Sequence, residues 1–308
     1  MSASSIVVGG ASRSVRRQGA DIRGMAFAGA LLLALLFSLA VLAVLIGTQL
    51  AQGMPVFAER GVDFLTSDLS SDPANAGVAQ GLIGTAFLVM IVAMTAFPIG
   101  IMTAVFLEEY SGDSRLARIV DINIRNLAGV PSVVYGILGL TVFVGLFAAV
   151  GEGNGKTVVT GGLTLAVLIL PLVIITSAEA LRAVPNALRE AGFGLGASRW
   201  QVVRKLILPA AAPGILTGTV LALSRAIGET APLILVGAVL GSFSTAGGIS
   251  ETLTGPYTAL PAIVFDWARK PQDEFRALTS AAIIVLLVVT IIANAFAIIL
   301  RNRYDRKW

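Results

Sequence analysis

The residues with the clearest chemical potential are an arginine and a glutamate inside a long apolar segment. Arg225 and Glu229 are four residues apart in the run Ser-Arg-Ala-Ile-Gly-Glu-Thr-Ala-Pro, which ends at Pro232. In a helix, this spacing places both side chains on one face, about one turn apart. Ionisable residues inside membrane spans usually face a cavity and mark a transport path. The alternative is a self-neutralising pair that only braces a helix bundle.

The composition predicts that the elements positioning this pair are membrane helices. Of the 308 residues, 56% are hydrophobic and 13% charged, whereas soluble domains are about 45–50% apolar and about 25% charged. The chain has neither Cys nor His, so disulfides, thiolate metal sites and the commonest general base are excluded. The net charge of +4 comes from scattered basic residues, which argues against nucleic-acid binding. We therefore expect no metal and no enzymatic activity in this chain.

Six apolar runs are each long enough to cross a bilayer, which needs roughly 20 residues. We expect an all-α integral membrane protein whose six-helix transmembrane bundle occupies 25–300, with spans at about 25–47, 78–107, 127–150, 157–177, 214–240 and 278–300. The serine- and arginine-rich segment 1–24 is predicted to be a disordered basic tail. Residues 301–308 form a second basic terminus, and 178–212 form the longest inner loop.

The distribution of Lys and Arg predicts the orientation of these spans. With both termini inside, 16 basic residues lie on the inner side, five lie outside, and Arg225 falls within a span. Cytoplasmic loops carry an excess of Lys and Arg. We therefore expect a multi-pass protein of a bacterial cell (inner) membrane, with both termini in the cytoplasm.

The loop 178–212 carries a spaced signature of small and charged residues. Glu-Ala-Gly is followed by three residues and a glycine, then nine residues and Leu-Ile-Leu-Pro. This resembles the signature of permeases in ATP-binding-cassette (ABC) importers, with Gly192 in place of a second alanine and Leu206 in place of isoleucine. The residues that match the pattern are Glu190, Ala191, Gly196, Leu208 and Pro209. The resemblance implies that this coupling loop docks on a separate ATPase, and the alternative is an amphipathic helix on the membrane surface.

The segment around the charged pair resembles a narrower group, the phosphate ABC permeases. Its run from Arg225 to Pro232 is typical of them, as is Gly-Val-Pro-Ser-Val-Val-Tyr-Gly from Gly129. The end of the chain and the outer segment 260–267 are more similar to the PstA type of subunit than to its PstC partner. The resemblance implies a substrate path that includes Arg225, Glu229 and Thr230. It also implies three partners: a PstC-like permease, two copies of a PstB-like ATPase, and an extracytoplasmic PstS-like phosphate-binding protein.

The residue chemistry agrees with a phosphate substrate. Arginine pairs with phosphate at two points, and Glu229 could accept the proton that phosphate retains near neutral pH. The alternatives are an ABC permease for sulfate or molybdate, and a secondary anion transporter without an ATPase. The segment from Gly151 to Thr157 looks like a phosphate-binding loop but has Val150 where the first glycine is needed. We therefore expect no cofactor in this chain and ATP-Mg bound by the partner ATPase.

Overall fold

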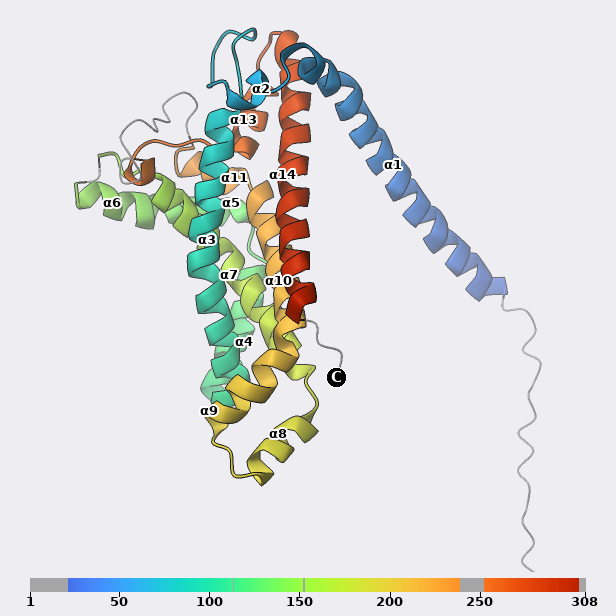
Figure 1. Cartoon of the computed structure of the whole chain (residues 1–308), viewed down its shortest axis with the longest axis vertical. Helices are drawn as coiled ribbons and strands as arrows, with labels where there is room; N and C mark the ends of the chain where they lie inside the picture. Colours follow the sequence, from blue (N-terminus) through green and yellow to red (C-terminus); the bar gives the residue numbers. More distant parts are fainter. Residues whose placement is uncertain (1–21, 113, 152, 239–251, 305–308) are drawn as a thin grey trace, which may run out of the picture. The chain divides into compact units, whose positions relative to one another are not determined.

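A computed structural model of the chain describes residues 22–112, 114–151, 153–238 and 252–304, and these residues are mostly helical (Figure 1). Within those ranges, six helical stretches are long and apolar enough to cross a membrane: Ile22–Arg60, Ala79–Tyr110, Ser132–Ala149, Val158–Arg182, Arg199–Gly228 and Glu274–Arg303. The all-α, six-span prediction is confirmed.

The chain divides into two units after Thr48. The described part of the first unit is the beginning of helix α1 (Ile22–Arg60), where nearly every side chain is exposed although most are apolar. A helix that is apolar all round suits a lipid environment. The described helices of the second unit, after the end of α1, are α2 (Asp63–Thr66), α3 (Ala79–Val105), α4 (Arg115–Ala128), α5 (Ser132–Gly139), α6 (Gly145–Ala149), α7 (Val158–Arg182), α8 (Asn186–Gly194), α9 (Arg199–Val202), α10 (Leu208–Gly228), α11 (Ala231–Leu235), α13 (Leu260–Trp267) and α14 (Glu274–Tyr304).

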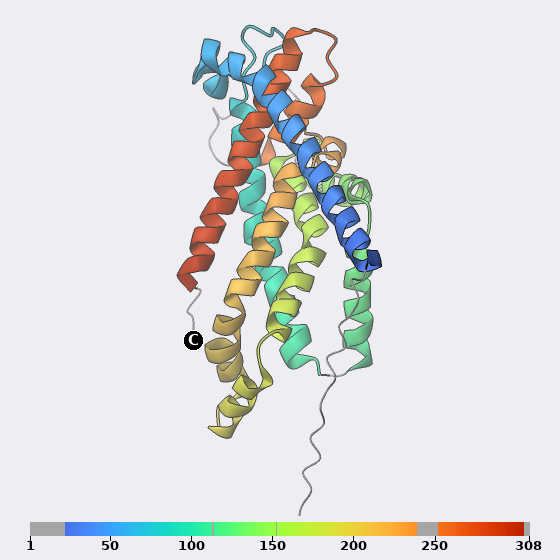
Figure 2. The same cartoon turned by 90° about the vertical axis from the view of Figure 1, so that its right-hand side faces the viewer.

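Helix α7 is the central element of the second unit. Most of its apolar span is buried, and it packs against α3 on one side and α10 on another (Figure 2). Small residues allow the close approach: a Cβ at Gly100 of α3 would lie 2.7 Å from Val173 Cγ1. A Cβ at Gly214 of α10 would lie 2.7 Å from the Cβ of Ala180. Close packing at small residues holds membrane helices together in place of a hydrophobic driving force.

The two ends of this bundle are built differently. At the α13 end, a buried aromatic cluster contains Phe64, Trp267 and Phe275, whose tilted rings have centroids 6.3 and 5.8 Å apart. At the opposite end, which we call the α8 end, α3 and α7 finish and α10 begins. Among the described residues, a five-residue π-helical turn ends the α3 stretch at Phe106–Tyr110, and two others lie within helical stretches at Leu140–Val144 and Val203–Ile207. Such turns occur frequently at functional sites.

Several predicted boundaries differ from the structure. The run expected as one span over 127–150 is broken, because α4 ends at Ala128 and α5 starts only at Ser132. Pro131 has no N–H and disfavours a helical residue before it, which explains the break. The loop predicted over 178–212 is shorter, since α7 continues to Arg182 and the helical stretch leading into α10 begins at Arg199.

The predicted tails lie mainly outside the described residues. Of the segment 1–24, only 22–24 are described, and they begin α1. Of the segment 301–308, residues 301–304 continue α14.

Candidate functional site

The helix that carries Arg225 ends three residues later. The sequence predicts one continuous span over 214–240, but α10 ends at Gly228, Glu229 is extended with φ −75° and ψ 124°, and α11 begins at Ala231. In a continuous helix, Pro232 would remove the hydrogen bond to the carbonyl of Gly228 and its ring would clash there. In the first turn of a new helix, the same proline costs nothing.

The predicted ion pair forms across this break. Arg225 Nε lies 3.1 Å from Glu229 Oε1, and the side chains are 41% and 16% exposed. Among the described residues, Glu229 is the only carboxylate in an ion pair with Arg225. Thr230 follows directly as the residue before α11, and it is half-buried. The pair is therefore neutralised within the chain, yet Arg225 remains accessible from one side.

The structure brings the second predicted motif against the first. A Cβ at Gly136 in α5 would lie 2.7 Å from the Cα of Pro232, so α5 and α11 are in backbone contact. Tyr135 is buried, and its hydroxyl donates a 2.8 Å hydrogen bond to the carbonyl of Leu127, which holds the turn between α4 and α5. The run from Gly129 to Gly136 thus supports the break beside Arg225.

One polar contact near the ion pair could not be predicted from the sequence. Ser224 donates to Asn294 Oδ1 at 2.6 Å, which joins α10 to α14. Both residues line an open groove of about 640 Å³ between α7, α10 and α14. Asn294 is separated from Ser224 by 70 residues, so spacing alone could not connect them.

The predicted coupling loop is a helical corner at the α8 end. Gly196 has φ +78°, the left-handed region that glycine adopts without strain, and it turns the chain between α8 and α9. Glu190, Ala191 and Gly196 are exposed, while Leu208 and Pro209 start α10. The exposed apolar side chains here are Phe193, Leu195 and Trp200.

The departure from the signature at Gly192 has a packing reason. A Cβ at this buried glycine would lie 2.8 Å from Val202 Cγ2. Helix α8 continues through Gly192 despite the lower helix propensity of glycine. Close packing of α8 on the Val202 side chain therefore explains why position 192 is a glycine.

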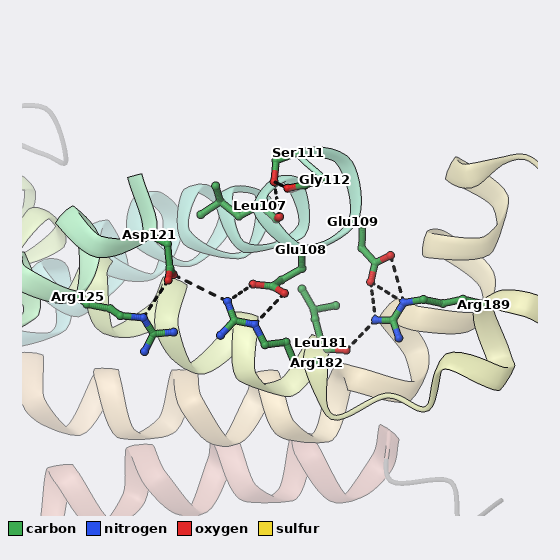
Figure 3. A network of polar contacts seen from close by, with 10 residues as sticks. All are labelled: Leu107, Glu108, Glu109, Ser111, Gly112, Asp121, Arg125, Leu181, Arg182 and Arg189. Carbon is green, nitrogen blue, oxygen red and sulfur yellow. Dashed lines mark hydrogen bonds and ion pairs between the residues drawn. The ribbon is translucent and has the colours of Figure 1, made fainter. Parts of the chain in front are cut away.

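A polar network at the α8 end was not predicted (Figure 3). Glu108 and Glu109, on the π-helical turn Phe106–Tyr110, bind Arg182 and Arg189. The paired residues are 74 and 80 positions apart in the sequence. Short-range residue spacing therefore does not predict these contacts.

Comparison with known families identifies this architecture. The family model described as binding-protein-dependent transport system inner membrane component matches residues 96–306, more than half of the chain. The chain belongs to this family. It is therefore a multi-pass membrane component of a transport system.

Curated relatives cover most of this permease. It is 34% identical over 254 residues to the probable ABC transporter permease protein YqgH of Bacillus subtilis, covering 77% of this chain and 80% of that one. It is 34% identical over 224 residues to the phosphate transport system permease protein PstA 1 of Mycobacterium tuberculosis, covering 72% and 70%. The PstA protein of Haemophilus influenzae is 30% identical over 249 residues, covering 81% and 83%.

Solved ABC importers share the fold of this permease. A chain of the MetNI methionine transporter, in an inward-facing conformation, aligns with a TM-score of 0.58 at 17% identity, covering 74% of this chain and 96% of that one. A chain of a bacterial transporter involved in importing the acidic polysaccharide alginate aligns with a TM-score of 0.61 at 16% identity, covering 92% and 96%. These likenesses confirm the predicted ABC importer type of bundle.

Proposed function

We propose that this permease is a PstA-type subunit of an ATP-driven importer of inorganic phosphate. Several relatives at 30–34% identity over most of the chain are named as phosphate transport permeases. In this proposal the chain forms the translocation path with a second, PstC-like permease. A PstS-like extracytoplasmic protein delivers phosphate, and two PstB-like ATPases dock at the α8 end.

The observation that carries the phosphate assignment is the accessible ion pair at the break between α10 and α11. Glu229 engages Nε of Arg225 at 3.1 Å, and the fork formed by Nη1 and Nη2 can pair with an oxyanion at two points. The Glu229 carboxylate accepts a hydrogen bond from the protonated oxygen that phosphate retains near neutral pH. The same carboxylate repels an oxyanion that carries no proton, such as sulfate or molybdate, because that anion has no O–H to donate.

The chain itself performs no catalysis and holds no cofactor in this proposal. ATP-Mg is bound and hydrolysed by the partner ATPase, which reaches the exposed residues Glu190, Ala191 and Gly196. The excess of basic residues on the loops of the α8 side supports a cytoplasmic location for that end and for both termini.

The proposal is tested by uptake of radiolabelled phosphate in a bacterial strain that lacks its own phosphate permeases. The strain expresses this chain together with its second permease, ATPase and binding protein. We expect saturable uptake that depends on ATP hydrolysis and is not reduced by an excess of sulfate or molybdate. Equal competition by either dianion would favour an importer of another oxyanion, and uptake without the ATPase would favour a secondary transporter.

A further inference from the structure

The π-helical turn Phe106–Tyr110 directs two neighbouring carboxylates at two different helices. Glu108 accepts hydrogen bonds of 2.9 and 2.5 Å from Nε and Nη2 of Arg182, the last residue of α7. Glu109 accepts from Arg189, which belongs to α8 (Figure 3). Consecutive residues on a helical turn point in different directions, so one turn at the end of α3 contacts both segments.

Arg189 is the more enclosed of the two arginines that bind this turn, and it donates hydrogen bonds to several acceptors. Its side chain is 20% exposed and that of Glu109 is 8% exposed. Nη2 lies 2.7 Å from Glu109 Oε1 and also donates to the carbonyl of Leu181 at 2.9 Å. Nη1 donates to the carbonyl of Val184 at 2.8 Å and to Asn186 Oδ1 at 3.1 Å. One guanidinium therefore joins the end of α3, the end of α7 and the start of α8.

The neighbouring pair, Arg182 and Glu108, contacts a different set of helices. Arg182 and Glu108 are 46% and 15% exposed, and Arg182 also lies 3.9 Å from Asp121 of α4. Asp121 in turn pairs with Arg125 of the same helix at 3.1 Å. These contacts connect α3, α4 and α7, but none of them includes α8.

Without Arg189, α8 is connected mainly to the segment that follows it. It packs through Gly192 on Val202 and Leu206, which lead into α10. The chain between α8 and α9 turns at the left-handed Gly196 and exposes Leu195 by 90%. A displacement of α8 would then pass to α10 by packing, and to α7 through the short connection 183–185. Arg189 adds a direct connection to the end of α3 through Glu109, and to α7 through the carbonyl of Leu181.

We propose that Arg189 and Glu109 form a tether that passes movement of the ATPase-docked α8 to α3 and α7. The inference rests on the proposed function, in which an ATPase binds the α8 end. Both are positioning residues, since they touch neither phosphate nor ATP. A low local dielectric strengthens a satisfied buried pair and makes it rigid. The tether adds side-chain contacts from α8 to α3 and α7 to the packing that already joins α8 to the segment leading into α10.

Two variants remove the tether, and a third provides a matched control. Glu109→Gln keeps the shape and removes the charge, and Arg189→Met keeps an unbranched apolar stem and removes the donors. Glu108→Gln makes the same chemical change on the same turn without touching α8. The complete transporter, with both permeases, ATPase and binding protein, is reconstituted in proteoliposomes. Phosphate uptake and ATP hydrolysis are measured together, with and without the loaded binding protein.

We expect Glu109→Gln and Arg189→Met to lower both the phosphate transported per ATP and the stimulation by binding protein. The decrease should be about fivefold or more, the lower range of typical coupling between sites. Glu108→Gln should stay within about twofold of the unmodified transporter, which is less than that range. The ATPase should remain bound in all three. Unchanged coupling in the first two variants, or release of the ATPase from them, would overturn the tether.

A covalent replacement of the tether separates movement from simple stability. The chain contains no cysteine, so the double variant Glu109→Cys, Arg189→Cys introduces the only thiols of this subunit. Joining them with a short bifunctional thiol reagent should restore coupling that the unlinked double variant has lost. Loss of activity on cross-linking would overturn the proposal, because the tether would then have to open during the cycle.

The proposed function can fail separately in these experiments. If the unmodified transporter takes up another oxyanion and not phosphate, the substrate assignment is wrong. The role of the tether is then still tested by measuring how strongly the binding protein stimulates ATP hydrolysis in each variant.

Discussion

Arg225 and Glu229 neutralise each other at the point where α10 ends, and the Arg225 side chain stays 41% exposed. Two opposite charges four residues apart in an apolar run predict a pair, and the structure confirms it at 3.1 Å. The support from Tyr135 and Gly136 follows from a contact between α5 and α11 that spacing does not reveal. Glu108 and Glu109 gave no signal at all, because an acidic pair at the end of an apolar run is equally typical of a solvated helix end.

At the residue scale, we predict that Glu229→Gln loosens the discrimination between phosphate and sulfate. Glutamine retains the shape of glutamate but adds a donor and removes the negative charge that repels an oxyanion without a proton. Phosphate uptake should fall while sulfate becomes an effective competitor, measured as inhibition of labelled phosphate uptake. An exposed acidic residue just before α14, changed by Asp273→Asn, provides the control. Unaltered uptake and selectivity in Glu229→Gln would argue that the carboxylate only neutralises Arg225.

The boundaries of the helices depend on a few residues at the element scale. Composition and run length suffice to find six spans, because a bilayer demands long apolar helices. The breaks at Pro131 and Pro232 are harder to predict, since Pro98, Pro171 and Pro213 lie inside helices that continue. A proline in a membrane helix is tolerated when neighbouring groups satisfy the freed carbonyl. Tertiary packing therefore decides which prolines end a helix.

At the same scale, we predict that Gly196→Ala impairs coupling while Gly194→Ala does not. Neither glycine has another atom within 4 Å of the added Cβ, but only Gly196 has a positive φ. A left-handed conformation costs an alanine about 1–2 kcal/mol, which should displace α9 relative to α8. We expect reduced stimulation of ATP hydrolysis by the binding protein in the first variant alone. Equal behaviour of the two variants would show that the turn at Gly196 has no role in coupling.

At the scale of the whole molecule, the arrangement of the second unit fits a subunit that works inside a larger assembly. Large apolar side chains are exposed along α5 and α14, which suits lipid or another membrane helix. The accessible side of Arg225 and the exposed Phe193, Leu195 and Trp200 belong to the same unit but lie on different elements. In the proposed function, substrate contact and ATPase contact therefore fall on separate parts of one bundle, connected through α7 and α10.

We propose that Arg225 and Glu229 bind phosphate and do more than brace the bundle. Phosphate uptake by the double variant Arg225→Glu, Glu229→Arg tests it most directly, in the assembled transporter with membrane insertion checked by blotting. A brace survives the exchange, because mutual neutralisation is retained, whereas a lone buried charge would be costly. A phosphate site does not survive it, because the guanidinium fork moves to the extended residue after α10. We predict that uptake falls about tenfold or more, the effect on a rate of losing about 1.4 kcal/mol. Full uptake by the exchanged protein would contradict the account and leave the pair as a structural brace.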